Sequence, residues 1–147
     1  MGVAIANYSK GARVERELLG ILHGNGYAVV RAAGSGVNAI SPDIVAMRAG
    51  AGIAIECKAW SSTSIAIPHE KFGLLEMWER NAGMPLFVGW RINGKSWLFI
   101  RLSEFRKTEK NYTMTLNIAR RINRGLEEIM QPHAESHGAG AGADSGR

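Results

Sequence analysis

Two apolar segments separated by three small residues constrain the fold of this chain most. Residues 43–48 (DIVAMR) and 52–60 (GIAIECKAW) have the length and the β-branched content that are typical of strands. Between them, Ala49-Gly50-Ala51 is short and small enough to form a turn. We therefore predict that the two segments pair as a β-hairpin.

The second predicted strand ends in charged residues, although the rest of it is apolar. Because successive side chains of a strand point to opposite faces, Glu56 and Lys58 share one face and Cys57 lies on the other. In the hairpin, Asp43 at the start of one strand lies near the end of the other. The sequence thus predicts two carboxylates and one ammonium group at the same end of the hairpin.

The segment before the hairpin predicts a helix over residues 11–23, with Ser9 as its N-cap and Gly24 as its end. Its apolar residues form one stripe along the helix, and Glu15 lies inside that stripe. A carboxylate directed at the core is costly unless it is paired. Glu15 is therefore a third candidate for the acidic group; the alternative is a partly exposed glutamate that pairs with an arginine.

The remaining periodic segments complete an α/β domain. The patterns predict strands over residues 27–32, 86–92 and 96–102, with an Asn93-Gly94 turn between the last two. Helices are predicted over 69–81 and 115–130. The order α-β-β-β-α-β-β-α predicts a mixed five-stranded sheet flanked by helices.

Two of the predicted helices carry features beyond a core-facing stripe. The helix over 69–81 has an apolar arc wider than one sheet needs, so we expect part of it in a dimer interface. The arc contains Leu74, Leu75, Met77 and Trp78, and Phe72 stands somewhat apart from it. On the last helix, Arg120, Arg121 and Arg124 are expected to point outward.

Composition limits the cellular setting and the partners. The formal net charge of +5 suits an anionic partner such as nucleic acid. Cys57 is the single cysteine, so an internal disulfide framework is excluded and a reducing compartment is favoured. The sequence has no apolar run of about 18 residues, so no membrane span is expected. We expect a cytoplasmic protein.

The chain is expected to form a single domain over residues 9–131. Residues 1–8 are predicted to be a flexible N-terminus. Residues 132–147 are Gly/Ala-rich and without apolar periodicity, so a disordered tail is expected.

The predicted cluster contains the groups that phosphodiester hydrolysis needs. Carboxylate oxygens hold Mg²⁺, which keeps several of its waters. The metal lowers the pKa of a bound water and neutralises charge on the phosphate. A lysine beside it positions that water or stabilises the transition-state charge. The sequence therefore predicts a metal-dependent nuclease.

Two parts of the sequence resemble a known family. Pro42-Asp43, followed after twelve residues by Glu56-Cys57-Lys58, resembles the PD-(D/E)xK nuclease motif. Residues 10–18 (KGARVEREL) and 29–35 (VVRAAGS) are similar to the opening of archaeal Holliday-junction resolvases. The resemblance covers roughly residues 9–100. It implies a restriction-endonuclease-like fold and a homodimer that makes paired symmetric nicks across a four-way DNA junction, in homologous recombination and repair.

The resemblance also assigns expected roles to the acidic cluster. It implies that Glu15, Asp43 and Glu56 are the catalytic acids and that Lys58 is the catalytic lysine. The three acids are the expected ligands of Mg²⁺, for which Mn²⁺ is expected to substitute. The Cys57 side chain is expected in the core, but its backbone carbonyl is a further candidate metal ligand.

Hydroxyl and basic positions of the family map onto a second group of residues. Ser35 is implied as a further catalytic residue, and Arg16 and Arg31 as basic contacts to DNA. A basic cluster beside the acids also suits a polyanion, which adds two residues to the group. The candidate DNA-binding residues are Lys10, Arg13, Arg16 and Arg31.

Simpler interpretations stay open for most of these residues. Glu56 and Lys58 would form a solvent-facing ion pair if their strand lay at the edge of the sheet. Asp43 would only start a turn after a proline, and Arg31 would be a surface charge. For the whole chain, the alternatives are a nuclease for duplex ends, flaps or specific sequences, or a non-catalytic DNA-binding protein. The acids argue against the last, because carboxylates facing a polyanion without a metal weaken binding.

Overall fold

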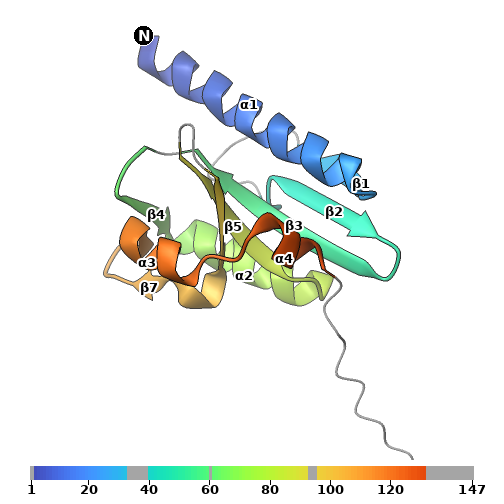
Figure 1. Cartoon of the computed structure of the whole chain (residues 1–147). Coiled ribbons are helices and arrows are strands. Elements are labelled where there is room, and N and C mark those ends of the chain that lie inside the picture. The colour runs from blue at the N-terminus through green and yellow to red at the C-terminus, as the bar shows by residue number, and fades with distance from the viewer. Residues whose placement is uncertain (1, 33–39, 60, 93–95, 132–147) are drawn as a thin grey trace, which may run out of the picture.

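The computed structural model describes residues 2–32, 40–59, 61–92 and 96–131, with side chains from residue 11 onward (Figure 1). Three of the sequence predictions fall outside these residues and stay predictions. They are the role of Ser35, the Asn93-Gly94 turn and the disordered tail.

A mixed five-stranded sheet forms the centre of the molecule, as predicted, with the strand order β1-β2-β3-β5-β6. The parallel pair is β3 with β5, and the other neighbours are antiparallel. The strands are β1 (Ala28–Arg31), β2 (Ile44–Arg48), β3 (Ala51–Lys58), β5 (Leu86–Arg91) and β6 (Trp97–Arg101). The predicted hairpin is confirmed as β2 and β3, with Ile44 opposite Ile55. In its turn Gly50 has a positive φ of 76°, which glycine adopts without strain.

Helices α1 (Gly2–Gly24) and α2 (His69–Ala82) lie on opposite sides of this sheet (Figure 1). The alternation of β3 separates two cores: Ile53 and Ile55 pack on the α1 side, and Ala54 packs on the α2 side. Val14, Leu18 and Leu22 of α1 are buried in the core on the α1 side, as the predicted stripe requires. On α2, Phe72 and Leu75 are buried in the core on that side.

A second, three-stranded sheet was not predicted. It has the order β4-β8-β7, with β4 (Ser64–Pro68), β7 (Arg106–Lys107) and β8 (Asn111–Thr115), and a short 3-10 helix, η1 (Leu102–Glu104), precedes β7. Tertiary contacts hold these short strands: Tyr112 of β8 stacks on Phe72 of α2 with ring centroids 3.7 Å apart. β7 has only two residues, too few for a periodic pattern, and β4 pairs with β8 across more than forty residues of chain.

The first helix begins earlier than predicted. α1 starts at Gly2 rather than near Gly11, so Ser9 lies within the helix and is not its N-cap. An N-cap signal in sequence is permissive, because serine is also tolerated inside helices. Whether residues 1–8 are flexible stays a prediction.

The single helix predicted over residues 115–130 is wrong, because the chain divides it into α3 (Leu116–Ile122) and α4 (Leu126–Met130). Between them the chain caps the edge strand β6. The Phe99 N–H donates to Asn123 Oδ1 at 2.9 Å, and the Arg124 N–H donates to the Phe99 carbonyl at 3.2 Å. Strand-edge groups need such partners. Arg124, predicted to point outward, instead pairs with both carboxylate oxygens of Glu104, at 2.8 and 2.9 Å.

Among the described residues, no helix is both long enough and apolar enough to cross a membrane.

Candidate active site

The hairpin brings the two motif acids together. β2 and β3 pair with Ile44 opposite Ile55, so continuing this register by one residue places Asp43 opposite Glu56. The Cys57 backbone N–H donates to Asp43 Oδ2 at 2.7 Å. Asp43 therefore links the start of β2 to the end of β3. The alternative, in which Asp43 only starts a turn, does not explain this hydrogen bond.

Glu56 is the one charged residue that is fully buried among the described residues, with 3% of its surface exposed. It follows Ala54 by two positions on the central strand and therefore faces the α2 side. Lys58 Nζ lies 3.6 Å from Glu56 Oε2. The alternative of a solvent-facing pair on an edge strand is wrong, because β3 has neighbours on both sides.

One oxygen of Glu56 has no partner of its own. Oε1 is buried, and no hydrogen-bond donor of the described residues reaches it. A buried carboxylate oxygen without a donor is costly unless another positive group takes its place. Asp43 and Glu56 both present carboxylate oxygens here, and Mg²⁺ takes oxygen ligands of this type. The site therefore fits a hard divalent cation.

The environment of Asp43 favours its protonated form. Burial and the neighbouring Glu56 carboxylate raise the pKa of Asp43 from 3.8 to about 7. The Cys57 N–H and the Lys58 ammonium offset only part of this rise. Two carboxyl groups close together in a low-dielectric site do not both ionise readily unless a cation lies between them. The raised pKa of Asp43 and the unpartnered oxygen of Glu56 both show that this site has too little positive charge for two ionised carboxylates.

Glu15 reaches the same end of β3 from the other side of the sheet. Its Oε2 accepts a hydrogen bond from Arg31 Nε at 2.7 Å, so the arginine pairing that the sequence left open is confirmed. Glu15 still acts electrostatically on this end: burial, then Asp43, then Glu15 raise the pKa of the Cys57 thiol. That raised pKa keeps the thiol protonated, as expected of a core cysteine rather than a nucleophile.

The described side chains contain no group of three acids, histidines or cysteines close enough to hold one ion. Asp43 and Glu56 come together as predicted, but Glu15 does not join them in direct contact. The predicted metal site of three acidic side chains is therefore reduced here to two acids, with Glu15 behind them on the α1 side.

Lys71 is a site residue that the sequence analysis missed. It lies in the first turn of α2, and its Nζ is 3.7 Å from Glu56 Oε2. The signal was present: Glu56 and Lys58 face away from Cys57, and a helix must cover that face. The apolar arc of residues 69–81 indicates packing, but it does not indicate that the lysine at the start of this helix meets the hairpin.

The predicted DNA-binding residues lie mainly on the α1 side. Arg13 and Arg16 are exposed on α1. Arg31 lies at the end of β1 with 35% of its side chain exposed. The backbone of Lys10 is helical, but its side chain lies outside the described part of the structure.

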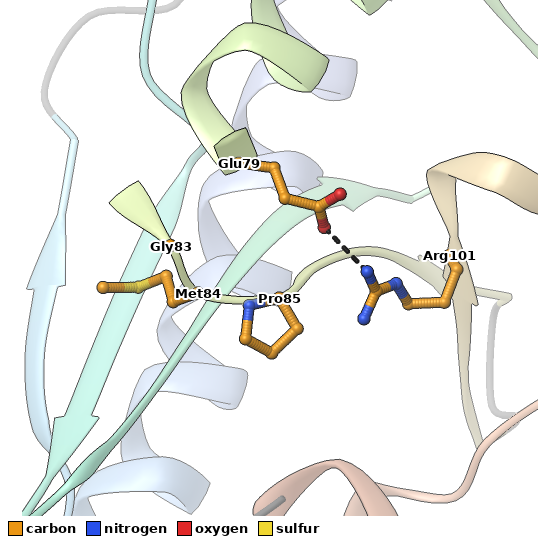
Figure 2. A pocket seen from close by; sticks show the side chains of 5 residues that line it. All are labelled: Glu79, Gly83, Met84, Pro85 and Arg101. Carbon is orange, nitrogen blue, oxygen red and sulfur yellow. Dashed lines mark hydrogen bonds and ion pairs between the residues drawn. The ribbon is translucent and has the colours of Figure 1, made fainter. Parts of the chain in front are cut away.

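A hollow of about 360 Å³ lies at the other end of α2, away from these acids. Figure 2 shows the Glu79 and Arg101 side chains meeting across it, with Nη2 and Oε2 3.2 Å apart. Glu79 also accepts the Leu86 N–H at 2.6 Å, so its carboxylate fixes the start of β5. Lys71 and Glu79 are separated by eight residues of helix, or roughly 12 Å. The hollow is thus distinct from the acidic cluster.

Comparison with known proteins identifies the family. The sequence profile of the archaeal Holliday junction resolvase (hjc) family matches residues 6–136. The crossover junction endodeoxyribonuclease Hjc of Sulfolobus acidocaldarius is 36% identical over 116 residues, which are 76% of this chain and 80% of that protein. The Hjc of Archaeoglobus fulgidus is 35% identical over 105 residues, covering 71% and 77%. The solved structure of the A. fulgidus protein, a Holliday junction resolvase, superimposes with a TM-score of 0.73 at 28% identity, covering 82% of this chain and 94% of that one. The chain belongs to the archaeal Holliday junction resolvase family.

Proposed function

We propose that this protein is an Mg²⁺-dependent endonuclease that cuts four-way DNA junctions by paired symmetric nicks, in recombination and repair. One observation carries the metal-dependent chemistry: the buried, unpartnered Oε1 of Glu56 beside a second carboxyl group whose pKa is raised to about 7. Family membership supports the junction as substrate.

Asp43 and Glu56 are the proposed metal ligands, together with the backbone carbonyl of Cys57. Mg²⁺ at this position would lower the pKa of a bound water and neutralise charge on the phosphate, and Mn²⁺ is expected to substitute. Glu15 is proposed to act through a water, because it stands behind the two acids and is held by Arg31.

Lys58 is the proposed catalytic lysine. Its ammonium group lies beside Glu56 and has 23% of its side chain open to solvent, so it can reach both the acids and an arriving phosphate. There it orients the attacking water or stabilises charge on the phosphate oxygens. Ser35 is proposed to act with it.

Phosphate contacts are proposed for the basic residues of the α1 side. Arg13 and Arg16 are exposed, and Arg31 is linked through Glu15 to the acidic end of β3. Lys10 completes the group. Such contacts give affinity that falls with salt, while selectivity comes from the shape of the branch rather than from base edges.

A homodimer is proposed because a nearly two-fold substrate suits two equal sites. Phe72 and Leu75 of the predicted helix are buried within one chain, so the interface is assigned to the rest of α2. There Met77 is 42% exposed, and Leu74 and Trp78 are partly exposed. Met77→Glu is expected to shift sedimentation toward the monomer. Met47→Glu is the matched control, since Met47 of β2 is also 42% exposed.

The deciding experiment is a cleavage assay. Purified protein is incubated with a synthetic four-way junction, a linear duplex, a flap and a single strand. Each substrate is tested in Mg²⁺, in Mn²⁺ and in chelator. Symmetric nicks in the junction that require the metal are expected, with Asp43→Asn as the inactive control. Equal cutting of linear duplex would contradict junction selectivity, and metal-independent cutting would contradict the proposed chemistry.

A further inference from the structure

Two ammonium groups contact Glu56, and only one of them belongs to the nuclease motif. Lys58 Nζ lies 3.6 Å and Lys71 Nζ 3.7 Å from the same oxygen, Oε2. The Lys71 side chain is 11% exposed and is therefore more enclosed than that of Lys58, which is 23% exposed. Lysine is seldom enclosed in this way unless it is paired, because burying its charge costs solvation energy.

The first turn of α2 is anchored on both sides of Lys71. Phe72 is buried and stacks on Tyr112 with ring centroids 3.7 Å apart. His69 Nε2 lies 2.8 Å from the carbonyl oxygen of Thr108. Both contacts tie this turn to the small sheet, so the backbone of Lys71 is held at a fixed place beside the end of β3.

The two lysines have different freedom to move. Lys58 is on β3 itself, has the more exposed side chain, and is the residue proposed to meet the DNA. If Lys58 alone compensated Glu56, turning toward a phosphate would leave a buried carboxylate unpaired, which is strongly unfavourable. With Lys71 on the same oxygen, Glu56 keeps a cationic partner when Lys58 leaves.

We propose that Lys71 is a positioning residue of the nuclease reaction. It holds the Glu56 carboxylate by Oε2, directs the unpartnered Oε1 toward the metal position, and balances the charge of Glu56 when Lys58 turns to the phosphate. This inference rests on the proposed function, because it concerns the same site. Lys71 acts through Glu56 and does not touch the DNA.

The first test measures junction cleavage in single turnover at saturating Mg²⁺. Lys71→Met removes the charge but keeps the length of the side chain, and it is expected to slow cleavage by about 10-fold or more. Lys71→Arg keeps the charge and is expected to recover most of the rate. Lys110→Met, at an exposed lysine before β8, is the matched control and should cleave as the unaltered protein does.

Junction affinity, measured in Ca²⁺ so that the DNA stays uncut, separates positioning from DNA contact. Lys71→Met is expected to bind the junction within about 3-fold of the unaltered protein, because Lys71 does not contact phosphate. Loss of affinity as large as the loss of rate would overturn the proposal in favour of a phosphate contact. Undiminished cleavage by Lys71→Met would also overturn it.

A second test needs neither metal nor activity. Thermal unfolding in chelator is compared for Lys71→Met, Glu56→Gln and the double variant. Lys71→Met is expected to lower Tm clearly in the Glu56 background and by less than half as much in the Glu56→Gln background, because the pair is then already broken. Equal losses in both backgrounds would show that Lys71 only packs, which contradicts the proposal.

The two proposals fail in distinguishable ways. If the unaltered protein does not cut junctions, the proposed function fails, while the unfolding cycle still tests the Lys71–Glu56 pairing. If the unaltered protein cuts and Lys71→Met cuts equally well, the role of Lys71 fails and the nuclease function stands.

Discussion

The two sides of the sheet hold their acids in opposite ways at the end of β3. On the α2 side, Asp43 and Glu56 are packed together, with one carboxylate oxygen unpartnered and the pKa of Asp43 raised to about 7. On the α1 side, Glu15 is partly exposed, and its Oε2 accepts a hydrogen bond from Arg31 Nε at 2.7 Å. The first arrangement leaves one carboxylate oxygen without a partner in the absence of a metal ion, whereas the second is satisfied without one. If a metal binds as proposed, its binding energy comes mainly from the α2 side.

The largest expected effect is on cleavage. Glu56→Gln should reduce the single-turnover rate by about 10³-fold or more, because it removes a proposed direct ligand. Glu15→Gln should cost about 10- to 100-fold, as for a residue that acts on a metal site through another group. Junction binding should persist in both variants. Equal losses of cleavage rate in the two variants would show that the acids on the two sides of the sheet do not act differently.

Metal-free stability should change with opposite sign on the two sides. A rise in the pKa of Asp43 from 3.8 to about 7 means that ionised Asp43 lowers the free energy of unfolding by at most roughly 4 kcal/mol. Because the folded-state pKa is the higher one, this cost is absent below about pH 4 and complete above about pH 7. Asp43→Asn, whose side chain can still accept the Cys57 N–H, should therefore stabilise the protein at pH 8. Chemical unfolding in chelator at pH 8 measures this gain in the free energy of unfolding.

Glu15→Gln is the matched comparison for that measurement. Losing the partly exposed pair with Arg31 should lower the free energy of unfolding by under about 1 kcal/mol. Destabilisation by Asp43→Asn at pH 8 as well would show that Asp43 is a structural acid.

Metal binding should depend on pH through the α2 side. If Mg²⁺ binds as proposed, it displaces a proton that Asp43 holds, so the apparent affinity should rise by about 10-fold from pH 6 to pH 8 and level off above that. Calorimetry in two buffers of different ionisation enthalpy counts the released protons. Glu15→Gln should keep this dependence, and Asp43→Asn should remove it. A constant affinity across this range would argue against the raised pKa.

The smallest expected effect belongs to Arg31. Arg31→Gln should change the free energy of unfolding by about 1 kcal/mol or less, because its side chain is 35% exposed. Junction affinity should weaken. The slope of the logarithm of the binding constant against the logarithm of salt concentration should become shallower by about one. Unchanged salt dependence would leave Arg31 with the sole role of holding Glu15.

The hairpin and its acids were predictable because strand alternation and register are local properties. Asp43, Glu56 and Lys58 lie within sixteen residues of one another, so a two-strand pairing was enough to bring them together. The five-stranded sheet followed from strands with clear apolar runs. Glu15 was singled out correctly as unusual, but its partner was not, because Arg31 is brought to it by packing of α1 on the sheet.

Other features depend on contacts between distant segments. Lys71 reaches Glu56 because α2 covers that face of β3, and the sequence showed that a helix must cover the face but not which residue of it would meet Glu56. The small sheet depends on the pairing of β4 with β8, which are distant in sequence. The helix over 115–130 was predicted from an apolar stripe that continues through the break, while the break itself is made by Asn123 and Arg124 bonding to Phe99.

That break also limits how copies of this chain can associate. At the outer edge of β6, the Phe99 N–H is taken by Asn123 and the Arg101 N–H by Glu104. A strand from another molecule would have to displace both side chains before it could continue the sheet. The chain thus closes this edge to strand addition with its own side chains, so a symmetric dimer such as the one proposed would need a different surface.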